Sequence, residues 1–355
     1  MPWQEWREIA MSPWFYISGV VLYAVLTTCV LLLLRRSAAT THGRWRDGAE
    51  KSALVLLAIL FCLLAVEGYM RFLNTGNGNQ IDMLAAQWMK RNWTPVNSLG
   101  YRDDDHSPGD LEQGKTIFVV GDSFTAGLGV ADYRQTFPKQ LEQILGAEFR
   151  VVTIADHGWN VGDYHEALTN YPFQQPNAVV LNLFCNDIEV DPMELPTPNL
   201  PRLFPGGALG FLTNTSFAIS AAYAQIVLVS VMPELQQGLL DLFANPEYLE
   251  RLNGYLDRLT EYAESRDAPL IVMVWPMFPS LDQSDQMNRH FFEFFDGRTA
   301  IVMDMKALLE HHTPMDLVVS RTDIHPNERA HELAARWLAE VVVEATAGAS
   351  SRTLQ

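Results

Sequence analysis

The chain has 355 residues, of which 42 are acidic and 25 are lysine or arginine, and its formal net charge at pH 7 is −17. Proteins that bind nucleic acid need a basic face to neutralise phosphates, and this composition argues against one, so we expect no nucleic-acid partner. The length exceeds that of a usual single domain, and one α/β domain with an appendage is the simplest organisation. The three cysteines have no disulfide or metal-ligand spacing, and the sequence calls for no metal and no organic cofactor.

Two apolar segments near the N-terminus are typical of transmembrane helices. Residues 15–34 are mostly apolar over about the length that spans a bilayer as a helix, and aromatic residues lie at their start. Residues 52–69 form a second, shorter run in which the first charge is Glu67. We therefore predict a membrane anchor over residues 1–73 with two transmembrane helices. A cleaved signal peptide is the alternative for the first helix, although its apolar stretch is long and no basic segment precedes it.

The charges around these segments predict their orientation. Cations are concentrated between the two runs, at Arg35, Arg36, Arg44, Arg46 and Lys51. The first fourteen residues carry only Arg7. Because cytoplasmic loops are enriched in lysine and arginine, the connecting loop is expected inside and both termini outside. We predict a protein of the bacterial cytoplasmic (inner) membrane whose remaining chain lies on the extracytoplasmic side.

A third apolar stretch covers residues 216–232, but serine, glutamine and small residues dilute it. A membrane crossing there would put the regions of Ser123 and His325, discussed below, on opposite sides of the membrane. We therefore interpret it as an amphipathic or buried helix. A functional alternative for residues 205–232 is a lid over an acyl-binding groove or a surface that touches lipid.

Beyond a polar linker and entry segment at 74–98, the sequence becomes regular. Five apolar runs of strand length are rich in β-branched residues and lack strict alternation, as expected of strands buried on both faces: 116–121, 149–155, 178–184, 269–275 and 300–305. Helical periodicity separates or follows them near 134–147, 162–171, 246–266 and 327–347. This alternation predicts a three-layer, doubly wound α/β domain over 99–347 with a central parallel sheet of about five strands. Residues 348–355 read as a disordered tail.

The carboxyl ends of these strands should gather the reactive residues at one edge of the sheet. The first strand runs directly into a turn with glycine at both ends, Gly121 and Gly127, and Ser123 lies where the chain leaves the sheet. Glycines permit a tight turn and let backbone N–H groups face a developing oxyanion. Taken alone, this turn is more typical of a serine that caps a helix.

Three further exit loops carry polar groups. The second strand ends in a loop that contains Gly158 and Gly162, and the third ends in Asn186 and Asp187. A backbone N–H and an amide side chain there can donate hydrogen bonds to an oxyanion. Near the C-terminus, Asp323 and His325 precede Pro326, which favours a helix start and would hold His325 on the loop before it.

In this order, the four loops resemble the conserved blocks of the SGNH (GDSL-type) hydrolase family, over roughly residues 95–345. The resemblance implies a flavodoxin-like SGNH fold with Ser123 as nucleophile, His325 as base and Asp323 as acid. It further implies an oxyanion hole formed by Ser123, Gly162 and Asn186, supported by Asp122 and Asp187. The segment 97–102 is similar to the lead-in of membrane-anchored bacterial members.

The sequence departs from the family pattern at three places. Phe184 stands where the block around Asn186 usually has glycine. The acid usually lies three residues before the histidine, where this chain has Thr322, whereas Asp323 lies two before it. Gly158 is an alternative to Gly162 as oxyanion donor. Cys185 is an alternative nucleophile to Ser123, but no basic partner that would lower its pKa is evident near it in the sequence.

The leading functional prediction is an extracytoplasmic serine esterase or O-acyltransferase. The resemblance implies acyl esters of a cell-surface glycan or lipid-linked substrate, and a lipid esterase or thioesterase would use the same chemistry with a more apolar groove. An alternative of a different class is a catalytically silent scaffold or binding subunit beside a membrane acyltransferase that serves polysaccharide assembly.

Overall fold

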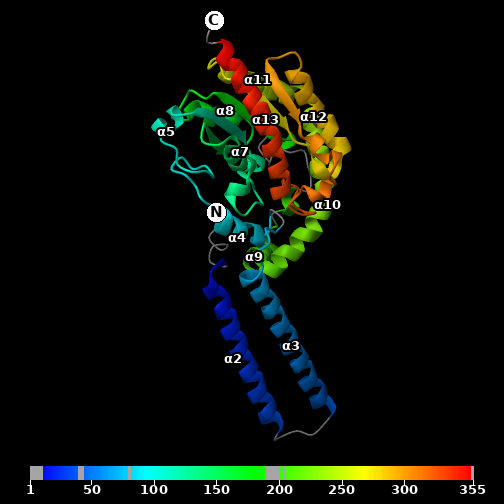
Figure 1. Ribbon diagram of the computed structural model, residues 1–355. Coiled ribbons are helices and arrows are strands. Elements are labelled where there is room, and N and C mark those ends of the chain that lie inside the picture. Colours follow the sequence, from blue (N-terminus) through cyan, green and yellow to red (C-terminus); the bar gives the residue numbers. More distant parts are fainter. Residues whose placement is uncertain (1–10, 39–43, 79–80, 189–199, 204, 353–355) are drawn as a thin grey trace. The chain divides into compact units, whose positions relative to one another are not determined.

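The computed structural model describes residues 11–38, 44–78, 81–188, 200–203 and 205–352 (Figure 1). Contacts divide the chain into two compact units, and each is described by itself. The first comprises Met1–Lys90 and Pro201–Val229, and the second comprises Arg91–Leu200 and Ser230–Gln355.

The first unit contains two long apolar helices, α2 (Pro13–Ala38) and α3 (Arg44–Phe72). Tyr16 of α2 donates a hydrogen bond to the carbonyl of Leu64 in α3 at 2.9 Å, and Tyr23 donates to Leu57 at 3.2 Å. Most other apolar side chains on both helices are exposed. The two predicted transmembrane segments are therefore helical, and both helices are long and apolar enough to cross a membrane.

Three further helices lie wholly or partly in the first unit: α4 (Met83–Asn92), α9 (Gly207–Thr215) and α10 (Phe217–Phe243). The segment predicted as a linker thus contains a helix. Its apolar side chains Met83 and Leu84 are buried with Phe217 in a small core, and their burial favours the helix. By length and composition, α10 is also a candidate membrane span.

The second unit is built on a five-stranded parallel sheet in the order β2-β1-β3-β4-β5, which is the flavodoxin-like order. Its strands are β1 (Lys115–Gly121), β2 (Phe149–Ala155), β3 (Ala178–Leu183), β4 (Leu270–Val274) and β5 (Ala300–Asp304). Ile117 of β1 pairs with Val151 of β2 and with Ala178 of β3. The predicted parallel sheet is confirmed.

Helices cover both faces of the sheet, which gives the predicted three layers (Figure 1). One face packs against α7 (Phe137–Leu145) and α13 (Glu328–Arg352). The other packs against α8 (Val161–Asn170), α11 (Pro246–Glu264) and α12 (Leu281–Phe295). In β1, Ile117 and Val119 face the first layer, whereas Phe118 and Val120 face the second. Burial on both faces explains why β1 to β4 lack alternation. The expectation was wrong for β5, an edge strand whose Ile301 is 41% exposed.

Short helices complete the second unit: α5 (Pro108–Glu112), α6 (Ser123–Ala126), and 3-10 turns at Tyr133–Gln135, Cys185–Asp187, Phe278–Ser280, Met305–Glu310 and Pro314–Asp316. The predicted disordered tail needs a correction at its start. Helix α13 continues past Ala345 and Ala347 to Arg352, so residues 348–352 are helical. The last three residues of that tail lie outside the described part.

Candidate active site

Ser123 is the first residue of α6, directly beyond the carboxyl end of β1. Asp122 caps the helix, since its carboxylate accepts the N–H of Phe124 at 2.9 Å. A Cβ on Gly121 would collide with the Thr125 side chain, and Gly127 ends the helix with φ of 75°. Both glycines therefore fit only because they lack a side chain. This turn holds the serine hydroxyl directly beyond the carboxyl end of β1.

His325 lies on the loop before α13, and backbone pairing fixes that loop. The N–H of Val319 donates to the carbonyl of His325 at 2.9 Å. Asn327 caps α13 by accepting the N–H groups of Arg329 and Ala330, and its amide donates to the carbonyl of Val318. The histidine is thus held from both sides, as expected of a residue before a helix start.

The structure brings the serine, the histidine and the aspartate together in one hydrogen-bonded relay. His325 Nε2 lies 2.8 Å from Ser123 Oγ, and His325 Nδ1 lies 2.5 Å from Asp323 Oδ1. The exposed fractions are 6%, 7% and 1% for Ser123, His325 and Asp323. Such an order of contacts is that of a Ser-His-Asp triad. Asp323 bonds to the imidazole, so the two-residue spacing suits this loop.

Two buried carboxyl groups lie behind the serine. Asp122 accepts the Ser123 hydroxyl at 3.3 Å, and burial raises the pKa of Asp122 to about 6. Asp187 accepts the Tyr164 hydroxyl at 2.7 Å and the Phe184 N–H at 2.8 Å. Burial, followed by the nearby charge of Asp122, raises the pKa of Asp187 well above its usual value.

Two of the predicted oxyanion donors, Gly162 and Asn186, lie on segments that one contact connects. Tyr164 follows Gly162 in α8, and its bond to Asp187 holds this helix to the turn that carries Asn186. The Asn186 side chain is exposed. The Gly162 N–H is already engaged, because it donates to Oδ1 of Asn160 at 2.8 Å as part of the α8 cap. Gly158 has φ of 77° in the preceding turn. The choice between the two glycines stays a prediction.

The departure at Phe184 has a packing role. Its ring stacks on Phe124, with centroids 4.2 Å apart, and Phe124 in turn lies 5.2 Å from the His325 ring. A glycine there would leave this aromatic layer unfilled. The neighbouring Cys185 is fully buried, and burial raises the pKa of its thiol. A buried, protonated thiol is a poor nucleophile, which argues against Cys185 in that role.

Arg102 is a residue of the site that the sequence motifs did not single out. Its guanidinium donates to the carbonyls of Ala126 and Gly127 at 3.0 and 2.8 Å, and to that of Val130 at 2.8 Å. These carbonyls end the helix that begins at Ser123. The family-like lead-in 97–102 was the available signal, but the contact depends on a turn 24 residues further along the chain.

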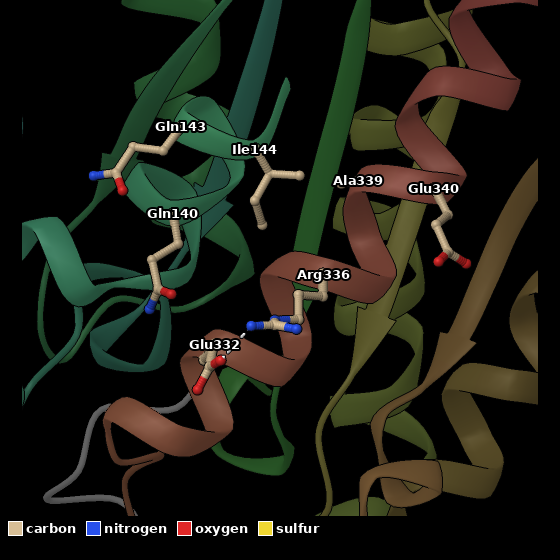
Figure 2. Close-up of a pocket in the computed structure, with 7 residues that line it drawn as sticks. All are labelled: Gln140, Gln143, Ile144, Glu332, Arg336, Ala339 and Glu340. Carbon is tan, nitrogen blue, oxygen red and sulfur yellow. Dashed lines mark hydrogen bonds and ion pairs between the residues drawn. The ribbon is translucent and has the colours of Figure 1, made fainter. Parts of the chain in front are cut away.

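A surface groove lies away from the relay. Figure 2 shows it between α7 and α13, lined by residues such as Gln140, Ile144 and Arg336, with a volume of about 540 Å³. Arg336 pairs with Glu332 of its own helix at 2.7 Å. None of the residues that line it belongs to the relay.

No protein-family model and no curated protein matches the sequence. Solved structures similar to the chain include TesA, which is 17% identical over 63% of this chain and 97% of that chain, with a TM-score of 0.38. A protein assigned to the G-D-S-L lipolytic family from Desulfitobacterium hafniense is 13% identical over 64% and 99%, with a TM-score of 0.42. A lipase/acylhydrolase from Enterococcus faecalis is 12% identical over 64% and 95%, with a TM-score of 0.40. The chemistry of this chain is inferred from its own Ser123, His325 and Asp323.

Proposed function

We propose that the chain is a membrane-anchored serine esterase or O-acyltransferase that acts outside the cytoplasm on acyl esters of a cell-surface glycan or lipid-linked substrate. The observation that carries the chemistry is the relay from Asp323 through His325 to Ser123, with contacts of 2.5 and 2.8 Å. The membrane tether supports a substrate at the cell envelope.

The mechanism follows from the relay. His325 Nε2 takes the hydroxyl proton of Ser123 as the oxygen attacks the ester carbonyl, and Asp323 stabilises the imidazolium. The tetrahedral intermediate expels the alcohol, which receives the proton from His325. The acyl group is then on Ser123. Water or a sugar hydroxyl, deprotonated by His325, takes the acyl group and regenerates the serine.

The negative oxygen of the tetrahedral intermediate needs hydrogen-bond donors. We assign the Ser123 N–H, the Gly162 N–H and the Asn186 amide to this role. For the Gly162 N–H to serve, it must be shared with, or released by, Asn160, which accepts it at 2.8 Å. Removal of one such donor typically lowers the rate by about 10²–10³-fold, so Asn186→Ala tests the assignment.

A fluorophosphonate probe tests the enzyme reading. The full chain in detergent should become labelled at Ser123, and labelling should vanish in Ser123→Ala and His325→Ala. Cys185→Ala is the matched control and should keep its labelling. A folded protein that takes no label would contradict catalysis and leave the scaffold subunit beside a membrane acyltransferase. Release of acyl groups to water or to a sugar then separates hydrolysis from transfer.

The orientation has a separate test. The cations between the two apolar helices favour a cytoplasmic connecting loop. Alkaline phosphatase fused at the C-terminus should therefore be active, whereas a fusion within the loop should be inactive. The reverse pattern would overturn the orientation without affecting the relay.

A further inference from the structure

Helix α9 and the first part of α10 form an uncharged segment. Between Arg202 and Glu234 the sequence has no charged residue and no histidine. We call residues 207–229 the apolar corner. It belongs to the same compact unit as the two predicted transmembrane helices, although about 130 residues separate it from them along the chain.

Glu67, near the end of α3, attaches this corner. Its carboxylate accepts the N–H groups of Phe217 and Ala218, both at 3.0 Å, and the hydroxyl of Ser216 at 2.9 Å. Those N–H groups open α10 and have no partner within the helix, so a carboxylate from another helix caps it. The start of α10 is therefore fixed at the end of the predicted second span.

Other contacts within the unit reinforce this attachment. Arg71 pairs with Glu67 at 3.0 Å, and its guanidinium carbon lies 4.8 Å from the ring centre of Phe217. Ser220 accepts the N–H of Met83 at 3.0 Å. The charged side chains of Arg71 and Glu67 are largely buried, with exposures of 2% and 14%. The corner is thus a defined part of the anchor unit.

Apolar side chains cover the open side of the corner. On α10, Ile219, Ala222, Ile226 and Val229 are exposed at helical spacings that place them on one face. Ile226 and Val229 are 71% and 74% exposed. On α9, the exposed apolar side chains are Leu209, Phe211 and Leu212. An apolar face beside apolar helices fits lipid better than water.

The corner is too short to cross a bilayer. Residues 217–229 of α10 span about 20 Å, whereas a bilayer core is about 30 Å thick. The rest of α10 belongs to the α/β unit, where Leu242 is part of the core. The whole helix is long and apolar enough to span a membrane. Its second half, however, packs in the α/β unit and is not available to cross a bilayer.

We propose that the apolar corner lies in the membrane interface, with Ile219, Ile226 and Val229 against lipid acyl chains in the leaflet where α3 ends. This inference rests on the proposed membrane anchoring. It adds a third membrane contact, which lies on the surface and does not span, and it makes acyl chains the ligand of this face.

Site-directed labelling tests the proposal in the full chain. Cys29 and Cys62 are replaced by serine, and single cysteines are placed at Ile226 and at Val229 for an environment-sensitive fluorophore. Buried Cys185 stays, and the background without an added cysteine should take no label. The protein is reconstituted in phosphatidylcholine and phosphatidylglycerol vesicles that carry a nitroxide either near the headgroup or near the acyl-chain end. We expect blue-shifted emission and a loss of roughly half of it with the shallow nitroxide, since interfacial helices bury their apolar face about 5–10 Å deep.

Matched controls separate the outcomes. Ile144→Cys and Val343→Cys, which are 50% and 51% exposed in the α/β unit, should stay unquenched. A separate variant that keeps Cys29 but has no added cysteine reports on the anchor, and the fluorescence of its label should be quenched. If the labels at residues 226 and 229 are unquenched while the label on Cys29 is quenched, the lipid contact of the apolar corner is rejected and the membrane anchoring stands. If the label on Cys29 is unquenched too, the membrane anchoring is also rejected. Blue-shifted but unquenched labels mean that protein covers the face, and stronger deep than shallow quenching means insertion across the core. Either result contradicts the proposal.

Discussion

At the scale of single residues, the relay depends on which acid orients His325. Asp323 bonds to Nδ1 at 2.5 Å and is 1% exposed. Asp323→Asn should lower the rate of ester hydrolysis by roughly 10⁴-fold, because an amide favours the wrong tautomer of the imidazole. Hydrolysis of a p-nitrophenyl ester measures this change. Thr322→Ala is the matched control and should retain most activity, and an equal loss in both variants would reject Asp323 as the orienting acid.

Arg102 acts at the same scale through the turn that carries Ser123. Its planar guanidinium serves several carbonyls at once, whereas the ammonium of lysine is a point charge. Arg102→Lys should therefore slow fluorophosphonate labelling of Ser123 by about ten-fold, which corresponds to about 1.4 kcal/mol. Arg134→Lys, an exposed arginine paired with Asp132, is the control. An unchanged labelling rate in Arg102→Lys would show that the turn keeps its conformation without the guanidinium contacts.

The buried carboxyl of Asp187 predicts a pH dependence of stability. Its pKa is raised in the folded protein, so the folded state keeps a proton that the unfolded chain releases near pH 4. The contribution of Asp187 to the stability of the wild type should fall as the pH rises above about 4 toward the folded pKa. Asp187→Asn cannot titrate and can still accept the Tyr164 hydroxyl. The melting temperature of Asp187→Asn in detergent, relative to that of the wild type, should increase as the pH rises. A constant difference between the two melting temperatures from pH 4 to 8 would contradict the prediction.

At the scale of elements, Lys139 joins α7 to the segment before β1. Its ammonium contacts Asp103 at 3.0 Å, Asp104 at 2.9 Å and Glu142 at 2.7 Å. Asp103 is fully buried and accepts the N–H of Thr153 in β2 at 2.9 Å. The cluster fixes residues 103–104 to α7 and to β2.

Loss of the Lys139 ammonium should therefore be costly. Lys139→Met removes the ammonium beside the buried Asp103 carboxylate, which keeps the imidazole of His106 at 3.0 Å, and should destabilise the protein by up to about 3–5 kcal/mol. Thermal unfolding in detergent measures it. Adding Asp103→Asn should recover part of the loss, since the uncompensated charge is removed. Lys306→Met, which breaks an exposed pair with Asp285, should cost less than about 1 kcal/mol, and a similar cost for both lysines would contradict the role of burial.

The elements also show what the sequence can predict. Strands such as β2 match the predicted bounds, because a buried parallel strand is a short β-branched run whatever its partners are. Helix α12 was missed although Met287, Phe291 and Phe295 recur every four residues. The grouping of residues 201–229 with the anchor was not predictable, because it depends on Glu67 meeting a helix start about 150 residues away. The acid of the relay likewise depended on loop geometry.

At the scale of the whole molecule, the relay and the apolar corner belong to different units. A chain that begins at residue 74 keeps Ser123, His325 and Asp323 but lacks α2 and α3. Its corner also loses the Glu67 carboxylate that accepts the N–H groups of Phe217 and Ala218. Such a chain should keep the activity of the relay, but its apolar corner is no longer attached to α3.

This shortened chain should therefore label with fluorophosphonate yet need detergent or lipid to stay monodisperse. Adding Ile226→Gln and Val229→Gln removes the two most exposed apolar side chains of α10 and should reduce its sedimentation with vesicles, because burial of apolar area drives interfacial binding. Ile144→Gln with Val343→Gln, on the α/β unit, should leave sedimentation unchanged. A shortened chain that is monodisperse and does not bind vesicles would show that the corner has no affinity of its own for lipid and that membrane attachment depends on α2 and α3 alone.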